Sequence, residues 1–455
     1  GDVFFRILDV DRIEPFFMSL LSSDDHWMFV ASNGAITCGR RNPERSLFPY
    51  YSSDKLLDFR ESAGPRTILR VLDGEEWNVW EPFGGRLQGG DIERHLYKNS
   101  LGSRLIFEEC NHRLGLTFRY QWTMGRRFGF IRTAHLQNSR ARARTVAVLD
   151  GFQNIVPGGV DSQFQLRFSN LLDAYKKSEL IGARRIGVHY LSSIPTDRAE
   201  PSEGLLASVA WATGLGESTV LLSDRQIDAF RNGMPTSTEF DVRGRRANYF
   251  VTATISLPGH GHRSWKLVAD VQQEAGDVVS LMKTLETAAE IDELLDEDVE
   301  QGENALRSYA SHADGVQACR QDRRAGRHLA NVLFNVMRGG VPLADYAVEN
   351  DGFVEQLFAR NRAVHDRHAD MLGSLPKVST SRDLVAACSA TKDADLVRLA
   401  MEYLPLTLSR RHGDPTRPWN RFDIRTRTSE GRRRVGFEGN WRDIFQNWEA
   451  LGFSY

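Results

Sequence analysis

This 455-residue sequence has few cysteines, no long apolar run and no excess of one charge. Each of these features excludes a class of proteins. The four cysteines, Cys38, Cys110, Cys319 and Cys388, lie far apart and form no CxxC pair. We interpret them as buried or idle thiols of a reducing compartment rather than as disulfides or metal ligands. No stretch approaches the run of about 18 apolar residues that a membrane span needs, and residues 1–10 carry no signal-peptide pattern. We therefore expect a cytoplasmic protein without a membrane partner.

The charge balance and several missing motifs exclude further classes. Lys and Arg total 58 and Asp and Glu total 60, so the net charge of −2 provides no field that would attract nucleic acid. The phosphate-binding loop GxxxxGK[ST], the nucleophile elbow GxSxG and the zinc motif HExxH are all absent. His260 and His262 flank a glycine, and His365 and His368 are three apart, but neither pair has further ligands at metal-binding spacing. We expect no metal and no cofactor.

Hydrophobic periodicity predicts a β-rich first part of the chain. Apolar residues alternate at Leu116–Trp122, again at Tyr249–Leu257, and on a return segment at Trp265–Ala269. Because Pro258–Gly261 supplies turn residues between the last two segments, we expect these to form a hairpin. Shorter strands are expected at Leu206–Thr213 and Thr219–Ser223. Strands at this spacing predict a large antiparallel β-sandwich.

The period changes near Asp277, and helices are expected from there on. Apolar residues from Leu281 to Leu295 recur at spacings of three and four, which predicts one continuous helix. The acidic run Glu290–Glu303 is interpreted as the solvated face and end of that helix rather than as a metal site. Further helices are expected at Leu329–Met337, Phe353–Leu372 and Asp383–Met401, the last with an N-cap within Ser379–Ser381.

Residues 410–434 contain nine arginines, with Pro415, Pro418, Trp419 and Phe422 among them. A nucleic-acid groove with aromatic stacking is one interpretation of this composition. A second is a long ordered loop whose arginines pair with nearby carboxylates, and a third is a loop that lines a polar ligand pocket. A single basic patch in a chain of net charge −2 favours the ordered loop, so we expect no nucleic-acid partner.

The segment from residue 436 to residue 451 carries the most informative pattern. Two glycines precede Asn440, a good N-cap, and a helical pattern follows it. The apolar stripe of this helix is formed by Trp441, Ile444, Phe445 and Trp448. The flanking polar residues are Arg442, Asp443, Gln446 and Asn447. A guanidinium beside a carboxylate and two amides can bind a polyhydroxylated ligand through several hydrogen bonds. The alternative is that these side chains form hydrogen bonds only with one another along the helix.

The sequence Trp441-Arg442-Asp443-Ile444-Phe445-Gln446-Asn447 resembles a motif of the inverting glycoside phosphorylases of glycoside hydrolase family 94. That family includes cellobiose phosphorylase, the phosphorylase-like part of cyclic glucan synthase and the 1,2-β-oligoglucan phosphorylases. Their motif, aromatic–Arg–Asp–x–x–Gln–Asp, lies at the first barrel helix, and Asn447 departs from it because better-known members have Asp there. The stretches Ser32–Thr37 and Leu47–Lys55 also resemble the opening of a bacterial branch of such proteins.

This resemblance implies three regions. They are a supersandwich-type β-sandwich at 1–272, a helical linker at 273–404, and the loop and first helix of a six-hairpin α/α barrel at 405–455. Arg442 and Asp443 would bind the sugar at the cleaved bond, with Gln446, Trp441 and Asn447 as neighbours. The family's general acid and phosphate ligands lie further along and are expected beyond Tyr455, so the chain alone is expected to be inactive.

The implied function is inverting phosphorolysis of β-linked gluco-oligosaccharides, with inorganic phosphate as co-substrate. The expected partner is the oligosaccharide substrate, and a homodimer is compatible with the resemblance. Two alternatives stay open. An inverting hydrolase on the same scaffold would need a carboxylate base in place of the phosphate ligands, and a non-catalytic carbohydrate-binding or scaffolding module would need neither.

Overall fold

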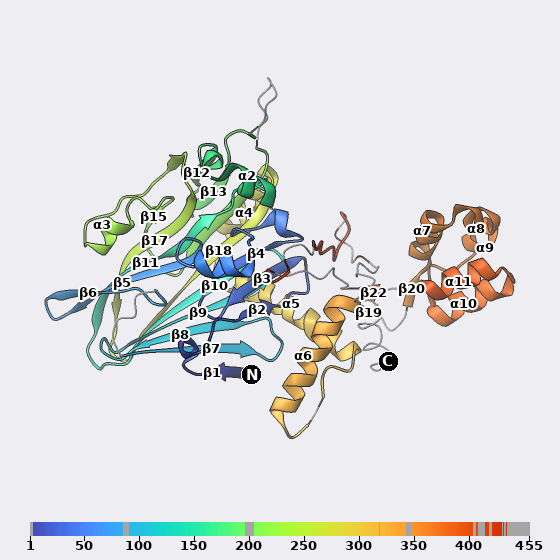
Figure 1. Ribbon diagram of the computed structural model, residues 1–455, viewed down its shortest axis with the longest axis horizontal. Coiled ribbons are helices and arrows are strands. Elements are labelled where there is room, and N and C mark those ends of the chain that lie inside the picture. The colour runs from blue at the N-terminus through green and yellow to red at the C-terminus, as the bar shows by residue number, and fades with distance from the viewer. Residues whose placement is uncertain are drawn as a thin grey trace. The chain divides into compact units, whose positions relative to one another are not determined.

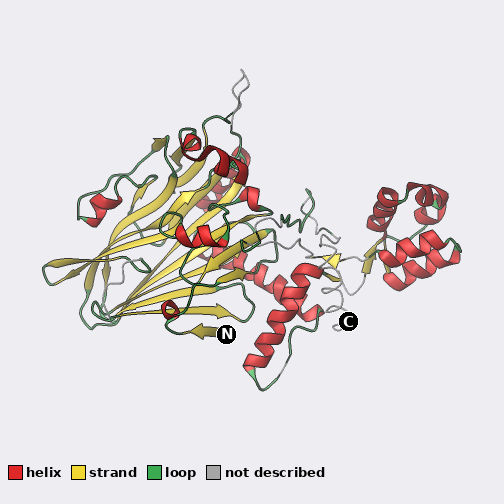
Figure 2. Ribbon diagram, in the orientation of Figure 1, coloured by secondary structure: helices red, strands yellow, loops and turns green. Residues whose placement is uncertain are grey.

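The computed structural model shows strands up to Gln273 and mainly helices from Ala275 onward (Figures 1 and 2). It describes residues 3–84, 91–195, 204–317, 319–342, 347–403, 406–407, 415–417, 421–429, 431 and 434. The chain divides into a β unit, residues 1–304 with 413–421, and a helical unit, residues 305–412 with 422–455. The predicted switch from strands to helices near Asp277 is confirmed, whereas the three predicted domain boundaries stay predictions.

The larger sheet of the β unit is antiparallel throughout. In spatial order its strands are β1 (Phe4–Ile7), β7 (Ile92–Asn99), β8 (Leu105–Asn111), β9 (Leu116–Gly125), β10 (Gly129–Asn138), β18 (His262–Gln273), β14 (Ala207–Thr213), β13 (Ile186–Leu191), β12 (Lys176–Ile181) and β16 (Asp241–Arg243). Arg132 on β10 is paired with Trp122 on β9 and with Leu267 on β18. Because directly paired residues point to the same face, Arg132 lies on the apolar inner face of this sheet.

A smaller antiparallel sheet faces the larger one across a shared core. Its strands in spatial order are β15 (Thr219–Leu221), β17 (Ala247–Leu257), β11 (Arg144–Ile155), β5 (Gly64–Asp73) and β6 (Glu76–Trp80). Asp150 on β11 is paired with Thr67 on β5. One cluster of buried side chains contains Trp122 of the larger sheet and Phe152 of the smaller one, and their rings stack with centroids 5.7 Å apart. The expectation of large antiparallel β-sheets is confirmed.

Smaller elements surround these sheets. They are the three-stranded sheet β2 (Phe17–Leu20), β3 (His26–Ala31) and β4 (Ile36–Arg40), the 3-10 turns η1 (Val10–Arg12) and η2 (Pro43–Arg45), and the helices α1 (Ser53–Asp58), α2 (Ser162–Asp173) and α3 (Ile227–Arg231). Met28 and Cys38 of the small sheet are buried in the same core as Trp122. The small sheet therefore extends the core rather than forming a separate one.

The predicted hairpin between β17 and β18 is wrong, because these consecutive strands belong to different sheets. β17 pairs with β11 and β15, whereas β18 pairs with β10 and β14. The chain thus crosses from the smaller sheet to the larger one at 258–261. Asn138, at the end of β10, donates through Nδ2 to the carbonyl oxygens of Pro258 (3.0 Å) and Arg142 (2.8 Å). Alternation fixes which side chains point inward, but it does not fix which strand is the neighbour.

Two helices, α4 (Ala275–Thr287) and α5 (Ile291–His312), replace the single helix predicted over Leu281–Leu295. Ala288 has an extended conformation (φ −70°, ψ 126°) and ends α4. Leu285 and Leu295 nevertheless lie in one buried cluster with Ile131 of the larger sheet. The apolar period continues across the break because both helices pack on the outer face of that sheet.

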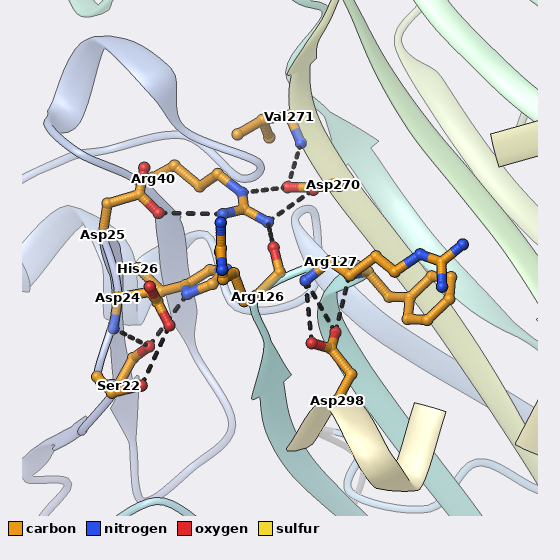
Figure 3. A network of polar contacts seen from close by, with 12 residues as sticks. Ser22, Asp24, Asp25, His26, Arg40, Arg126, Arg127, Asp270, Val271 and Asp298 are labelled. Carbon is orange, nitrogen blue, oxygen red and sulfur yellow. Dashed lines mark hydrogen bonds and ion pairs between the residues drawn. The ribbon is translucent and has the colours of Figure 1, made fainter. Parts of the chain in front are cut away.

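The acidic run Glu290–Glu303 is not solvated throughout, so that expectation is wrong for two of its residues. Asp298 accepts from the backbone N–H groups of Arg127 (2.9 Å) and Phe128 (3.0 Å), as Figure 3 shows in part. Glu303 is bound by Arg104, with Nε–Oε1 and NH2–Oε2 distances of 2.7 Å. Both carboxylates are buried because they attach α5 to loops of the larger sheet.

The helical unit continues with α6 (Asp322–Gly339), which contains the predicted helix Leu329–Met337, and with the strand pair β19 (Val341–Pro342) and β22 (Leu406–Thr407). The segment between them contains β20 (Ala347–Glu349), α7 (Asn350–Arg360), α8 (Arg362–Arg367), α9 (Ala369–Gly373), β21 (Val378–Thr380), α10 (Ser381–Ala390) and α11 (Ala394–Glu402). Its helices share one buried core, which includes Phe353, Leu384 and Leu396.

Two predicted helices of this segment are interrupted. Phe353–Leu372 is divided into α7, α8 and α9, and Asp383–Met401 into α10 and α11. The side chain of Asn361 accepts from the N–H of Val364, and that of Asp393 accepts from the N–H of Leu396, so each side chain starts a new helix. The predicted N-cap is confirmed at Thr380, whose Oγ1 accepts from the N–H of Asp383 at 3.1 Å.

Candidate ligand-binding site in the β unit

The predicted sugar-binding residues Trp441, Arg442, Asp443, Gln446 and Asn447 lie outside the described residues. Their arrangement therefore stays a prediction. The same holds for the alternative, in which these side chains form hydrogen bonds only with one another.

The arginine-rich segment 410–434 is described in part. Arg425 Nε lies 2.5 Å from Asp423 Oδ2, and Arg427 donates to the carbonyl oxygen of Gly431 at 3.1 Å. Phe422 and Ile424 are buried. Such contacts are expected in an ordered loop whose arginines pair with nearby groups. The absence of a nucleic-acid partner stays a prediction.

Among the described residues, no three His, Cys, Asp or Glu side chains form a group that could hold a metal ion. The two histidines at spacing three each contact a carboxylate: His365 Nδ1 lies 2.9 Å from Asp366 Oδ1, and His368 Nε2 lies 2.8 Å from Asp393 Oδ2. All four cysteines are free thiols. Across the part of the chain that is described, no helix combines the length and apolarity required to cross a membrane.

An ion pair between Arg132 and Asp150 lies inside the core that the two sheets share. The side chains are 1% and 0% exposed, and Arg132 NH1 lies 2.9 Å and 2.7 Å from the two carboxylate oxygens. Asp150 also accepts from Thr67 Oγ1 (2.7 Å) and Trp265 Nε1 (2.6 Å). The guanidinium lies against the Tyr120 ring, 4.5 Å from its centroid. These contacts fix the position of Arg132 among apolar neighbours.

A cavity of about 590 Å³ adjoins this ion pair. Its lining combines residues of both sheets with residues of the loops beside them. The polar and aromatic residues that matter for its chemistry are Asn33, Arg60, Arg66, Thr67, Glu81, Phe83, Tyr120, Arg132, Gln153 and Arg231. The volume lies in the range of small-molecule sites, about 300–1,000 Å³. We therefore take this cavity as the candidate ligand-binding site.

Two carboxylates around the cavity, Glu81 and Glu109, are bound by protein groups. Glu81 lies 2.6 Å from Arg231 Nε and 3.6 Å from Arg66 NH2. Glu109, buried beside the cavity, accepts from Trp80 Nε1 (2.7 Å) and Arg94 Nε (2.8 Å). Glu61 also lines the cavity. The charges of Glu61 and Glu109 favour the charged form of Arg60, but within the described part of the chain neither carboxylate forms an ion pair with its guanidinium.

Phe83 has a backbone conformation that few bulky residues adopt. Its φ is +59°, in the left-handed region, and its N–H donates to Glu109 Oε2 at 2.6 Å. Its ring packs edge-on against Tyr120, with centroids 5.2 Å apart. The carboxylate of Glu109 thus holds a strained residue that presents an aromatic ring to the cavity.

Arg60 and Tyr120 bring unused polar groups to the cavity. Within the described part of the chain, the Arg60 guanidinium has no ion pair and no hydrogen bond, and the Tyr120 hydroxyl has no hydrogen bond. Burial, and then the charge of Arg94, lowers the pKa of Arg60 from its usual value. Burial raises the pKa of the Tyr120 phenol, which is therefore a neutral O–H donor. Among the described residues the site therefore offers a guanidinium without a direct partner and a hydroxyl that is free to donate.

A second charge network has no such unused groups (Figure 3). Arg40 of β4 binds Asp270 through Nε (2.6 Å) and NH2 (2.8 Å), and Asp25 through NH1 (3.0 Å). Its NH2 also donates to the carbonyl oxygen of Arg126 at 2.9 Å. Because the guanidinium is engaged on every side, we interpret this network as structural.

A larger recess of about 1080 Å³ is also less suited to a charged ligand. Arg70 lies over the ring of Trp77, 4.6 Å from its centroid. Arg184 donates to the carbonyl oxygen of Leu285 (3.1 Å), and Arg185 donates to that of Ser218. Its three arginines are thus engaged, whereas Arg60 is not.

The sequence signal for the buried ion pair is a charged residue at an inward position of an alternating strand. Arg132 stands among Phe130, Ala134 and Leu136, and Asp150 among Val148 and Phe152. No expectation drawn from the sequence included this pair. Arg60 and Phe83 lie outside regular strands and carry no comparable signal.

Comparison with known proteins gives one family match. Residues 344–405 match the model of glycoside hydrolase family 149 insertion domain 1. This range contains the whole segment from β20 to α11. No curated protein matches the chain. The match names family 149, whereas the motif at Trp441 resembles family 94, so family 94 is not shown. Both families consist of carbohydrate-active enzymes, so the match shows that a part of the chain is similar to a domain of such enzymes.

Several solved structures resemble the chain weakly. A bacterial glucoamylase complexed with acarbose is 11% identical over 88% of this chain and 61% of that chain, with a TM-score of 0.36. A protein from the human microbiome assigned as a kojibiose phosphorylase is 7% identical over 85% and 48%, with a TM-score of 0.38. Heparinase III is 10% identical over 58% and 36%, with a TM-score of 0.28. The chain spans less than two thirds of the length of each, and likenesses this low define no function.

Proposed function

We propose that this chain is part of a carbohydrate-active enzyme that cleaves β-linked gluco-oligosaccharides by inverting phosphorolysis. The observation that carries the proposal is the match of residues 344–405 to an insertion domain of a glycoside hydrolase family. This match supports an enzyme that acts on glycosidic bonds over a purely structural protein.

The choice of phosphorolysis rests on the resemblance of Trp441–Asn447 to the family 94 motif. In inverting cleavage an acid protonates the glycosidic oxygen while a nucleophile attacks the anomeric carbon from the opposite face. Phosphate takes the place of the activated water of an inverting hydrolase. The bond from the anomeric carbon to the leaving oxygen breaks as the bond to phosphate oxygen forms, so a β-glucoside yields an α-configured glucose 1-phosphate.

In this proposal the polar residues of the motif bind the sugar next to the cleaved bond. Asp443 accepts hydrogen bonds from hydroxyl groups, and Arg442 and Gln446 donate to hydroxyl or ring oxygens. Trp441 and Asn447 are neighbours of these groups. The acid and the phosphate ligands are not assigned to residues of this chain.

Turnover with and without phosphate tests the proposal. The full-length protein that carries this chain would be incubated with β-1,2-, β-1,3- and β-1,4-linked gluco-oligosaccharides, and both glucose and glucose 1-phosphate would be quantified. We expect glucose 1-phosphate from at least one linkage, and no turnover without phosphate. Release of free glucose at the same rate in both conditions would support the hydrolase alternative instead. Binding without turnover under either condition would support the non-catalytic module.

A further inference from the structure

We infer that the cavity between the two sheets of the β unit binds a monosaccharide that carries one anionic group, either a phosphate ester or a carboxylate. The cavity is the one lined by Arg60, Tyr120 and Phe83, and the inference does not depend on the function proposed for the residues around Asp443.

The charge of the cavity selects an anion. Asp150 is held by Arg132, Thr67 and Trp265, and Glu81 is held by Arg66 and Arg231. Arg60 is half-buried, and the charges of Glu61 and Glu109 act on it, but it forms no ion pair among the described residues. A phosphate or carboxylate accepts two parallel N–H bonds from a guanidinium, so a ligand of this charge would supply the missing partner of Arg60.

The neutral polar groups select hydroxyls. Asn33 uses its side-chain oxygen to accept from the N–H of Ala35 (3.1 Å), which leaves its NH2 group as a donor. Gln153 uses its NH2 group to donate to the carbonyl oxygen of Glu61 (2.8 Å), which leaves its oxygen as an acceptor. The Tyr120 hydroxyl is a further donor. Each sugar hydroxyl can both donate and accept a hydrogen bond. A cavity lined by fixed donors and acceptors can therefore bind several of them at once.

The aromatic lining selects a ring with an apolar face. Phe83 and Tyr120 both line the cavity, and the Phe83 ring is held there by the hydrogen bond from its N–H to Glu109. Strained backbone of this kind clusters at ligand-binding positions. The cavity volume of about 590 Å³ is larger than the volume that an inorganic ion alone would fill. A sugar ring with a charged substituent satisfies the size, the apolar surface and the charge together.

Isothermal titration calorimetry on the 455-residue protein tests the inference. The probes are glucose 1-phosphate, glucose 6-phosphate and glucuronate, with glucose and inorganic phosphate as the neutral and ring-free controls. The first three distinguish a phosphate ester from a carboxylate and the position of the ester. We expect at least one to bind, and neutral glucose to bind at least 10-fold more weakly, on the order of one charge-assisted hydrogen bond.

Two variants locate the binding. Arg60→Gln should weaken the affinity for the anionic sugar by about 10- to 150-fold, the ratio that one charge-assisted hydrogen bond corresponds to. Because Arg60 has no partner among the described residues, the melting temperature should stay unchanged. Arg142→Gln, which removes an exposed arginine that does not line the cavity, should leave the affinity unchanged.

Three results would overturn the inference. They are no binding of any anionic sugar at millimolar concentration, equal affinity in wild type and Arg60→Gln, and equal affinity for inorganic phosphate alone. The second would place the bound sugar elsewhere in the chain, for example near Arg442, and the third would leave an anion site without a sugar.

Discussion

Replacing Asp150 by alanine should destabilise the β unit by about 3–5 kcal/mol, the usual effect of removing one partner of a buried ion pair. The Asp150 carboxylate is fully buried and accepts from Arg132, Thr67 and Trp265. Its removal leaves a guanidinium in the core with no counterion, and also leaves a hydroxyl and an indole N–H without an acceptor.

The double variant Arg132→Leu with Asp150→Leu separates the charge from the packing. Both charges are then absent, so at least about 2 kcal/mol of the loss should be recovered, because apolar pairs replace buried ion pairs at little net cost. Thr67 and Trp265 still lack their acceptor, so recovery should be incomplete. Asp241→Ala, which removes an exposed ion pair with Arg243 and a longer contact with Lys177 (3.7 Å), is the surface control and should change stability by less than about 1 kcal/mol.

Urea unfolding followed by tryptophan fluorescence measures these effects. Seven of the nine tryptophans belong to the β unit, among them the buried Trp27, Trp80, Trp122, Trp211 and Trp265, so most of the signal reports on that unit. A loss of this size should lower the midpoint by about 1–2 M. A midpoint for Asp150→Ala equal to that of Asp241→Ala, or a double variant as unstable as the single one, would refute the account of the ion pair.

Three further predictions concern other parts of the chain. His189 is fully buried, and burial lowers its pKa to about 3, so wild type should lose stability relative to His189→Asn as the pH falls from 6.5 toward 3. The difference should be about 1.4 kcal/mol per pH unit by chemical denaturation, and parallel curves would contradict it. Thr380→Ala should cost the helical unit about 0.5–2 kcal/mol by circular dichroism, since it removes the capping box of α10, and an unchanged melting curve would argue against that cap. Asp443→Ala in the full-length protein should lower kcat/KM by about 10- to 150-fold with an unchanged melting temperature. An unchanged kcat/KM in a destabilised variant would support the intrahelical network instead.

The sequence predicts the faces of the strands but not their neighbours. Leu116–Trp122 alternates with a period of two, and its apolar side chains are buried as expected. β17 and β18 carry the same alternation on consecutive strands, yet they belong to opposite sheets. The pairing depends on contacts with β10 and β11, far earlier in the chain, which no local pattern contains.

The sequence does not reveal where the predicted helices are interrupted, and the reason differs from that for the strands. Asn361 and Asp393 stand inside helical apolar patterns, and both act as N-caps that restart the helix. Their residue types are compatible with a cap, but the surrounding apolar spacing is compatible with a continuous helix. Ala288 carries no breaking signal at all, because alanine is a strong helix former, yet it ends α4 and packs against the buried cluster on the larger sheet.

The candidate cavity was predictable only in part. Charged residues at the inward positions of Arg132 and Asp150 indicate a buried pair of opposite sign. That they meet depends on β10 and β11 lying in different sheets that face each other. Arg60 and Phe83 come from irregular segments, and only the folded chain brings them to the same cavity.

The configuration of the first sugar product distinguishes inverting phosphorolysis from hydrolysis. The full-length protein that carries this chain would cleave a β-linked gluco-oligosaccharide in phosphate buffer, and the first product would be followed by proton and phosphorus NMR. We expect α-glucose 1-phosphate as the initial product, with its formation slowed about 10- to 150-fold by Asp443→Ala. Free glucose as the initial product, formed equally well without phosphate, would contradict it.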